Sequence, residues 1–179
     1  ADELIAKVTE RMATLKIGDG RRNCDMGPLV TREHRDKVAG YIEVAEQDGA
    51  SIVVDGRGIN VDGDANGFWL GPTLIDNVPT TSRVYTEEIF GPVLSILTFR
   101  TPQEAIEKAN NTPFGLSAGV WSEKGSRILW ATQQLRAGVI WANSFNKFDP
   151  TSPFGGYKES GWGREGGKHG LASYLKEGK

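Results

Sequence analysis

Residues 86–93 constrain this chain more than any other stretch, because two acidic residues there run into an apolar pair and then into a Gly-Pro turn. Pro92 fixes φ and lacks an N–H donor, so the turn is stiff, and Gly91 lets another group approach the backbone closely. The apolar run of residues 93–99 that follows predicts a buried strand. A carboxylate and an aromatic ring beside such a turn suit a polar, planar ligand, because the acid accepts hydrogen bonds and the ring offers a flat face.

Helical and extended patterns alternate along the rest of the chain. Apolar residues recur at helical spacing over residues 2–15, 31–47, 101–109, 125–135 and 165–176. Short apolar runs bounded by turn residues predict strands over residues 51–55, 68–75, 94–99, 116–121 and 138–143. This alternation predicts an α/β fold in which helices flank a mostly parallel sheet. Residues 77–85 are predicted to be a loop, and residues 144–162 a longer loop of the kind that often carries function.

The composition narrows the class of protein. A chain of 179 residues with 38% apolar and 25% charged residues can bury one globular core. The net charge of -2 and the lack of a basic patch argue against nucleic acid or an anionic membrane as a partner, and no apolar run is long enough to span a bilayer. One cysteine cannot form an internal disulfide, so we expect a cytoplasmic protein.

Four strings carry a family resemblance. In chain order they are GFWLGPTLI, EEIFGPV, ANNTPFGLSAGVW and SPFGGYKESGWGRE. In this order and spacing the chain resembles the aldehyde dehydrogenase superfamily, which is a more specific signal than a lone glycine motif, and Asp149-Pro150 and Tyr174-Leu175 are most similar to family 16. The resemblance implies that residues 1–179 are the C-terminal part of an incomplete aldehyde dehydrogenase-like catalytic domain, with the Rossmann-like cofactor domain absent.

The resemblance also implies an activity for the parent protein, which is the oxidation of a small-molecule aldehyde to a carboxylic acid with NAD or NADP. The family's catalytic cysteine and glutamate correspond to positions before residue 1, so we expect no catalytic residue in this chain and no activity of the chain alone. The parent enzyme is expected to be a homo-oligomer. The alternative is a non-catalytic dehydrogenase-like module that acts in assembly or binding, similar to family 16 segments that lack the nucleophile.

Four residues match cofactor-binding positions of the family. Glu88 matches the position that accepts hydrogen bonds from ribose hydroxyls on the nicotinamide side, and Phe90 matches the one that packs near the nicotinamide ring. His34 and Lys37, three residues apart at the start of a helix, match positions near the adenosine ribose. The residues also allow a plain structural interpretation, in which Glu87 and Glu88 are solvated acids, Phe90 belongs to the core, and His34 and Lys37 lie on a solvated helix face.

Three residues of the long loop match positions that line the family's substrate tunnel. They are Asn146, Phe148 and Phe154. Aromatic walls would favour an apolar aldehyde over a charged one, but the same rings could simply anchor the loop to the core.

Two further features are predicted to have no chemical role. Cys24 lies in a polar loop without an ordered base nearby, so we predict an ordinary loop cysteine rather than a nucleophile. Residues 56–67 are rich in glycine and aspartate but lack the spacing of a calcium loop, so no metal site is predicted.

Overall fold

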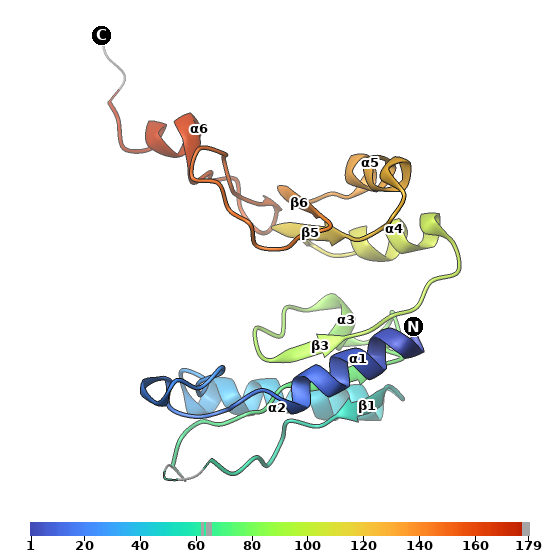
Figure 1. Cartoon of the computed structure of the whole chain (residues 1–179), viewed down its shortest axis with the longest axis vertical. Coiled ribbons are helices and arrows are strands. Elements are labelled where there is room, and N and C mark those ends of the chain that lie inside the picture. Colours follow the sequence, from blue (N-terminus) through green and yellow to red (C-terminus); the bar gives the residue numbers. More distant parts are fainter. Residues whose placement is uncertain (62, 64–65, 177–179) are drawn as a thin grey trace. The chain divides into compact units, whose positions relative to one another are not determined.

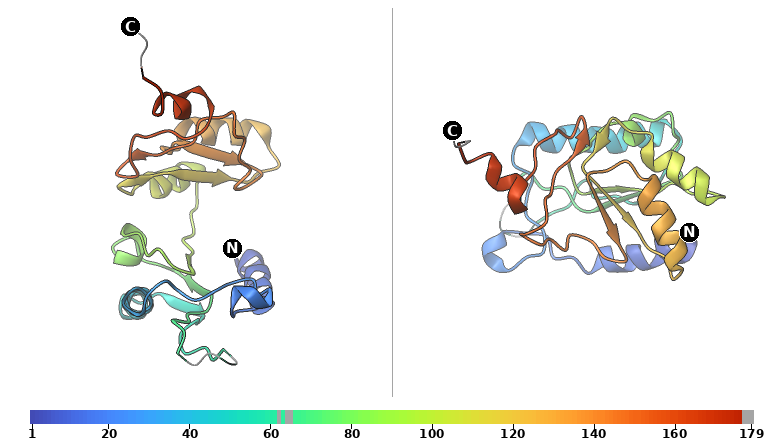
Figure 2. Two further views of the ribbon diagram at one scale, coloured as in Figure 1. Left: turned by 90° about the vertical axis from the view of Figure 1, so that its left-hand side faces the viewer. Right: turned by 90° about the horizontal axis from the view of Figure 1, so that it is seen from above.

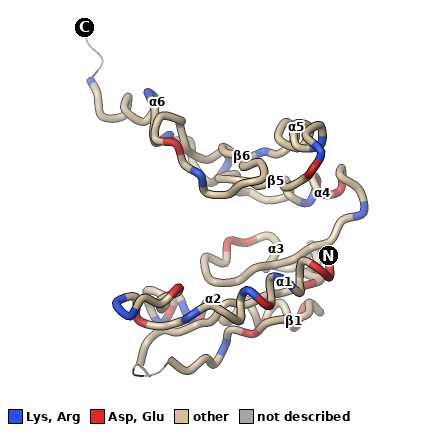
Figure 3. The backbone as a smooth tube through the Cα atoms, viewed as in Figure 1, with Lys and Arg blue, Asp and Glu red and all other residues tan. Residues whose placement is uncertain are grey.

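The computed structural model describes residues 1–61, 63 and 66–176, and the chain divides into two compact units, Ala1–Thr98 and Phe99–Lys179 (Figure 1). Both units combine helices with strands, which confirms the predicted α/β class. None of the helices in the described ranges combines the length and the apolar character needed to cross a membrane. Basic and acidic residues are interspersed along the backbone (Figure 3).

The first unit is built on a three-stranded sheet in the order β1 (Ser51–Val54), β2 (Thr73–Asp76) and β3 (Val93–Ser95). β1 and β2 pair antiparallel, whereas β2 and β3 pair parallel with Leu74 opposite Leu94. The helical elements of this unit are α1 (Asp2–Ala13), the short 3-10 helix η1 (Gly20–Arg22), α2 (Arg32–Gln47) and α3 (Arg83–Thr86). α2 packs against β1 and α3 (Figure 2).

The core of the first unit lies between α2 and β2. Val38, Ile42 and Ala45 recur every three or four residues along α2 and are fully buried, as are Leu74 and Ile75 of β2. Burying a side chain the size of valine or leucine contributes roughly 1.5–3 kcal/mol. This stripe is the reason that α2 forms over almost the whole range predicted from the sequence.

The second unit contains two separate strand pairs. β5 (Ser117–Val120) and β6 (Val139–Ala142) are parallel, and β4 (Phe114–Gly115) and β7 (Tyr157–Lys158) are antiparallel. Its helices are α4 (Pro102–Asn110), α5 (Gly125–Gln134) and α6 (Gly167–Ala172). α5 joins β5 to β6, because parallel neighbours need a crossover connection.

The structure corrects several of the predicted boundaries. The buried strand predicted within residues 93–99 is limited to β3, and Leu94 and Phe99 are 50% and 59% exposed. Residues 77–85 are not only a loop, because the Ser82 side chain accepts a hydrogen bond from the Val84 N–H and starts α3. The strand predicted at residues 68–75 is shorter, because Pro72 has no N–H to give to a ladder and pairing begins only at Thr73. The predicted loop of residues 144–162 contains the two-residue strand β7.

The antiparallel pairs β1–β2 and β4–β7 add to the parallel pairs that the sequence predicted. Between β1 and β2, the residues that the structure describes contain no helix. A parallel return normally needs a crossover of a dozen or more residues, usually helical, whereas an irregular connection lets the chain come back antiparallel.

Candidate functional site

One face of α2 defines the first candidate site. The helix is capped by Thr31, whose hydroxyl accepts a hydrogen bond from the backbone N–H of His34 at 3.1 Å. His34, Val38 and Tyr41 follow at spacings of four and three residues, so their side chains lie on one face. All three contact residues 87–92, which we call the acidic loop.

His34 and Val38 hold the acidic loop at Phe90 and Gly91. Nε2 of His34 lies 2.7 Å from the carbonyl oxygen of Phe90, so the imidazole N–H donates a hydrogen bond to the loop backbone. The two rings also meet edge to face, with centroids 6.2 Å apart. Gly91 packs directly on Val38, because a Cβ at this glycine would lie 2.6 Å from Val38 Cγ1. The close approach that the sequence suggested for Gly91 is therefore made by the buried side of α2.

The acidic loop is held at its first residue by hydrogen bonds to the Glu87 carboxylate. The Tyr41 hydroxyl donates to Oε2 at 2.6 Å, and Nε and Nη2 of Arg83 donate to Oε1 and Oε2 at 2.7 and 2.9 Å. The Arg83 guanidinium also lies 5.5 Å from the centroid of the Tyr41 ring. The hydrogen bonds from Arg83 and then from Tyr41 lower the pKa of Glu87 to about 2. The carboxylate in turn raises the pKa of Tyr41, chiefly through its hydrogen bond.

Between these two ends, side chains alternate between solvent and protein. Glu88 is exposed, Ile89 is half-buried against the core, and Phe90 is 75% exposed at a φ of 56°. Among the described residues, the Glu88 side chain makes no hydrogen bond or ion pair. The interpretation of Phe90 as a core residue is therefore wrong, and Glu87 is a partnered acid rather than a merely solvated one.

His34 and Lys37 differ in their surroundings although they share a helix face. Lys37 is exposed, and its charge adds a small part to the lowering of the pKa of Glu87. His34 is half-buried and one of its ring nitrogens is used by Phe90. The solvated-face interpretation thus describes Lys37 but not His34, while contact with an adenosine ribose remains a prediction for both.

The second unit carries an aromatic cluster at the start of the long loop. The Phe148 ring meets Phe154 at a centroid distance of 4.9 Å and Trp141 at 5.3 Å, and Trp141 meets Phe145 at 6.3 Å, all edge to face. Trp141, on β6, is buried, whereas Phe148 is 55% exposed. The rings therefore anchor the loop, as one alternative from the sequence proposed, and the exposed part of Phe148 leaves an aromatic surface open. The other alternative, that these residues line a substrate tunnel, stays a prediction.

The backbone around this cluster is fixed locally. Asn146 adopts a φ of 58°, a left-handed conformation that asparagine tolerates better than most residues. The N–H groups of Phe154 and Glu165 each donate to the other's carbonyl oxygen at 2.7 Å. The structure thus brings Phe148 and Phe154 together and places Asn146 in the same loop, while their role in substrate binding remains a prediction.

Cys24 lies in the loop that follows η1 and packs against Gly18. It is half-buried, and its Sγ lies 2.8 Å from the position that a Cβ on Gly18 would occupy. Within the described residues, no group of three or more His, Cys, Asp and Glu side chains is placed to hold a metal ion. The prediction of no metal site in residues 56–67 falls partly on residues 62 and 64–65, which lie outside the described residues.

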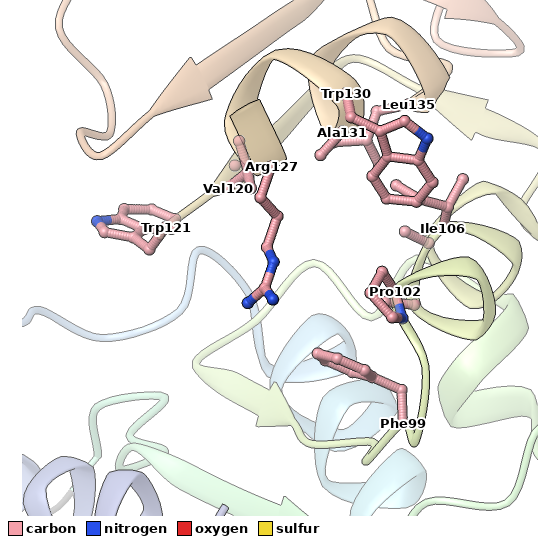
Figure 4. Close-up of a pocket in the computed structure, with 12 residues that line it drawn as sticks. Phe99, Pro102, Ile106, Val120, Trp121, Arg127, Trp130, Ala131 and Leu135 are labelled. Carbon is pink, nitrogen blue, oxygen red and sulfur yellow. The ribbon is translucent and has the colours of Figure 1, made fainter. Parts of the chain in front are cut away.

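A pocket of about 340 Å³ lies between α4, β5 and α5 in the second unit (Figure 4). Its walls include the rings of Phe99, Trp121 and Trp130, and Arg127 contributes a cation. None of the residues predicted for cofactor or substrate binding lines it. The pocket leaves apolar surface open to solvent, which proteins normally cover with a ligand or another segment.

Comparison with known proteins assigns this fold and these loops to one class. A family model described as the aldehyde dehydrogenase family matches residues 1–178. The chain belongs to the aldehyde dehydrogenase family, as its four sequence strings predicted.

Individual relatives add detail. Betaine aldehyde dehydrogenase of Bacillus subtilis (strain 168) is 38% identical over 176 residues, which are 98% of this chain and 36% of that protein. Betaine aldehyde dehydrogenase of Mesorhizobium japonicum is 40% identical over 174 residues, or 97% of this chain and 36% of that protein. The chain therefore spans little more than a third of the length of these curated relatives. The closer resemblance to family 16 stays a prediction.

A solved structure supports the same assignment. The crystal structure of betaine aldehyde dehydrogenase from Staphylococcus aureus in complex with NAD+ has a TM-score of 0.91 and 38% identity to this chain, and the match covers 98% of this chain and 35% of that one.

Sequence reasoning missed four side chains that organise the two sites. They are Tyr41, Arg83, Trp141 and Phe145. A local signal existed for Tyr41, which follows His34 by seven residues on the same face of α2, and for Arg83, which precedes Glu87 by one helical turn.

Proposed function

We propose that this chain is part of an NAD-dependent aldehyde dehydrogenase that oxidises an aldehyde to a carboxylic acid. In this proposal the chain supplies cofactor and substrate contacts, while the catalytic cysteine and glutamate come from outside its 179 residues. The observation that carries the proposal is the acidic loop, in which Glu88 and Phe90 face solvent while their neighbours are fixed to α2. Membership of the family supports the reaction class.

The surroundings of Glu88 fit a nicotinamide cofactor. Its carboxylate is exposed and unpaired among the described residues, so it is available to accept hydrogen bonds from two ribose hydroxyls. The exposed ring of Phe90 offers a flat face two residues away. NAD held there would supply its nicotinamide ring as the acceptor of a hydride. NAD is favoured over NADP because a solved relative contains NAD+.

The aromatic cluster supports an apolar aldehyde as the substrate, because it offers apolar ring faces. A second candidate is betaine aldehyde, which the names of the relatives suggest. Aromatic faces also attract quaternary ammonium groups, so Phe148 and Phe154 could accept its trimethylammonium head. Betaine aldehyde and 3,3-dimethylbutanal have the same shape and differ in charge, so the ratio of their kcat/KM values separates the two candidates.

The experiment that tests the proposed function is a chimaera. Residues 1–178 replace the matching part of Bacillus subtilis betaine aldehyde dehydrogenase, and NADH formation is followed with several aldehydes. A folded chimaera that turns over supports the proposal. A folded chimaera that binds NAD no better than the free chain and does not turn over would instead support a non-catalytic module for assembly or binding. Light scattering on the active protein tests the expected homo-oligomer.

A further inference from the structure

The two acids of the acidic loop are not equivalent. A carboxylate offers about four acceptor positions, and Glu87 already uses three of them, for Tyr41 and for two donors of Arg83. Glu88, its neighbour, uses none of its own among the described residues. One acid is therefore committed to the protein and the next is left free for a ligand.

We propose that Tyr41, Arg83 and Glu87 are positioning residues that hold the neighbouring Glu88 and Phe90 in the conformation that binds the nicotinamide side of NAD. This inference rests on the proposed function and adds a division of labour within the Glu-Glu pair. Glu87 fixes where the loop begins, and Glu88 makes the contact.

The backbone conformation of the acidic loop at Phe90 has to be stabilised by contacts with other elements. Phe90 has a φ of 56°, in the left-handed region that a bulky residue adopts only when its surroundings impose it. On one side of it, His34 holds the Phe90 carbonyl and Val38 packs on Gly91. On the other side, Glu87 leaves α3 in an extended conformation, with φ of -105° and ψ of 154°.

The anchor at Glu87 is itself tied to the core. The Glu87 N–H donates to the Arg83 carbonyl at 2.9 Å, and α3 is capped by Ser82, which is 2% exposed. The Tyr41 side chain reaches Glu87 from α2 and is 5% exposed. Two elements, α2 with the buried Tyr41 and α3 with the buried Ser82 cap, thus converge on one carboxylate. An exposed ion pair within one helix contributes little to stability, so geometry is the better explanation of this arrangement.

Two variants and one control test the proposal. Tyr41→Phe removes the hydroxyl and keeps the buried ring, and Arg83→Lys keeps the charge but loses the two-pronged geometry. Glu3→Gln is the control, because it removes an ion pair with Lys7 four residues away on α1, outside the loop. Amide hydrogen exchange of Glu87, whose N–H donates to the Arg83 carbonyl, is measured in the 179-residue chain. The KM for NAD and kcat are measured in the chimaera.

We expect Tyr41→Phe to speed exchange of the Glu87 amide. It should raise the KM for NAD by about tenfold, the loss of roughly one charged hydrogen bond, with kcat within about twofold of the parent chimaera. Arg83→Lys should give a smaller shift of the same kind, and Glu3→Gln none. The double variant Tyr41→Phe/Glu87→Gln should raise the KM for NAD no more than the worse of the two single variants does. Both substitutions act on the same hydrogen bond, between Tyr41 and Glu87.

An unchanged KM in Tyr41→Phe and Arg83→Lys, while Glu88→Gln raises it, would overturn the positioning role. Equal acceleration of exchange throughout the first unit would overturn it as well, because it would show a general loss of stability. If Glu88→Gln leaves the KM unchanged while Tyr41→Phe speeds exchange only in the loop, the cofactor role of the loop fails although its anchoring stands.

Discussion

Nε2 of His34 lies 2.7 Å from the carbonyl oxygen of Phe90, so the first turn of α2 fixes the backbone of a residue whose ring is largely in solvent. Sequence resemblance assigns these two residues to different parts of a dinucleotide, His34 to the adenosine ribose and Phe90 to the nicotinamide. The hydrogen bond gives His34 a structural task in addition, because it holds the loop that carries Phe90.

Gly91→Ala should destabilise the chain by about 1–3 kcal/mol, the usual cost of overpacking a tight core. The added Cβ would lie 2.6 Å from Val38 Cγ1, and Val38 is fully buried. Denaturant unfolding measures the change, and Val38→Ala in the same chain should recover part of the loss by making room.

Gly40→Ala is the matched control for Gly91→Ala. Gly40 lies within α2, and a Cβ there would meet nothing within 4 Å. Alanine in place of glycine inside a helix stabilises by about 0.5–1 kcal/mol. Equal destabilisation by the two substitutions would mean that the packing of Gly91 on Val38 is not the cause.

Low pH should weaken the contacts that Arg83 and Tyr41 make with Glu87. The pKa of Glu87 is lowered from 4.5 to about 2 by Arg83 and Tyr41. A carboxyl with a lowered folded-state pKa stabilises the fold fully above its unfolded value and loses that contribution as the pH falls through its folded value. The difference in unfolding free energy between the wild-type chain and Glu87→Gln should therefore be small, because the ion pair is exposed, and should shrink between pH 4.5 and pH 2. A difference that does not depend on pH in this window would contradict the ion pair.

The helix that carries the site was predictable, and its long-range contacts were not. Thr31 and the buried stripe along α2 are local signals, so the range of this helix follows from the sequence. The hydrogen bond between Tyr41 and Glu87 joins residues 46 positions apart. No periodicity records such a pairing, because it depends on how α3 and α2 pack around the sheet.

The conformation of Phe90 shows the same limit. An aromatic residue in an apolar stretch is normally assigned to the core, since burial of aromatic rings is favourable. The left-handed φ of Phe90 turns its ring outward instead. Propensity disfavours this conformation, so only tertiary contacts with α2 could specify it. The family resemblance predicted a cofactor contact for Phe90, whereas its residue type alone predicted burial in the core.

Glu88→Gln should raise the KM for NAD in the chimaera by about ten- to a hundredfold, the loss of one charge-assisted hydrogen bond. Because Glu88 is exposed and has no partner among the described residues, thermal stability should not change. Steady-state kinetics against NAD concentration, with a melting curve, measure both. Unchanged kinetics at normal stability would return Glu88 to the solvated surface.

Cys24→Ser should leave the activity of the chimaera intact. The Sγ atom packs on Gly18 in a turn where Gly18 N–H donates to the Met26 carbonyl at 3.0 Å. The hydroxyl is smaller than the thiol and keeps the turn, so only a modest loss of stability is expected. An aldehyde oxidation assay decides the point, since a loss of turnover without unfolding would identify Cys24 as a nucleophile.

The 179-residue chain alone should form no NADH from any aldehyde. Nucleophilic aldehyde oxidation needs a thiolate, a base and oxyanion donors in one geometry, and the one cysteine of the chain is placed in the turn beside Gly18. Glu88 and Phe90 offer contacts to one end of a dinucleotide, so NAD binding by the chain should be weak. Isothermal titration of NAD and an NADH assay on the purified chain measure both properties. Turnover that Cys24→Ser abolishes would show that the chain has a catalytic site of its own and would overturn the assignment of the chemistry to residues outside it.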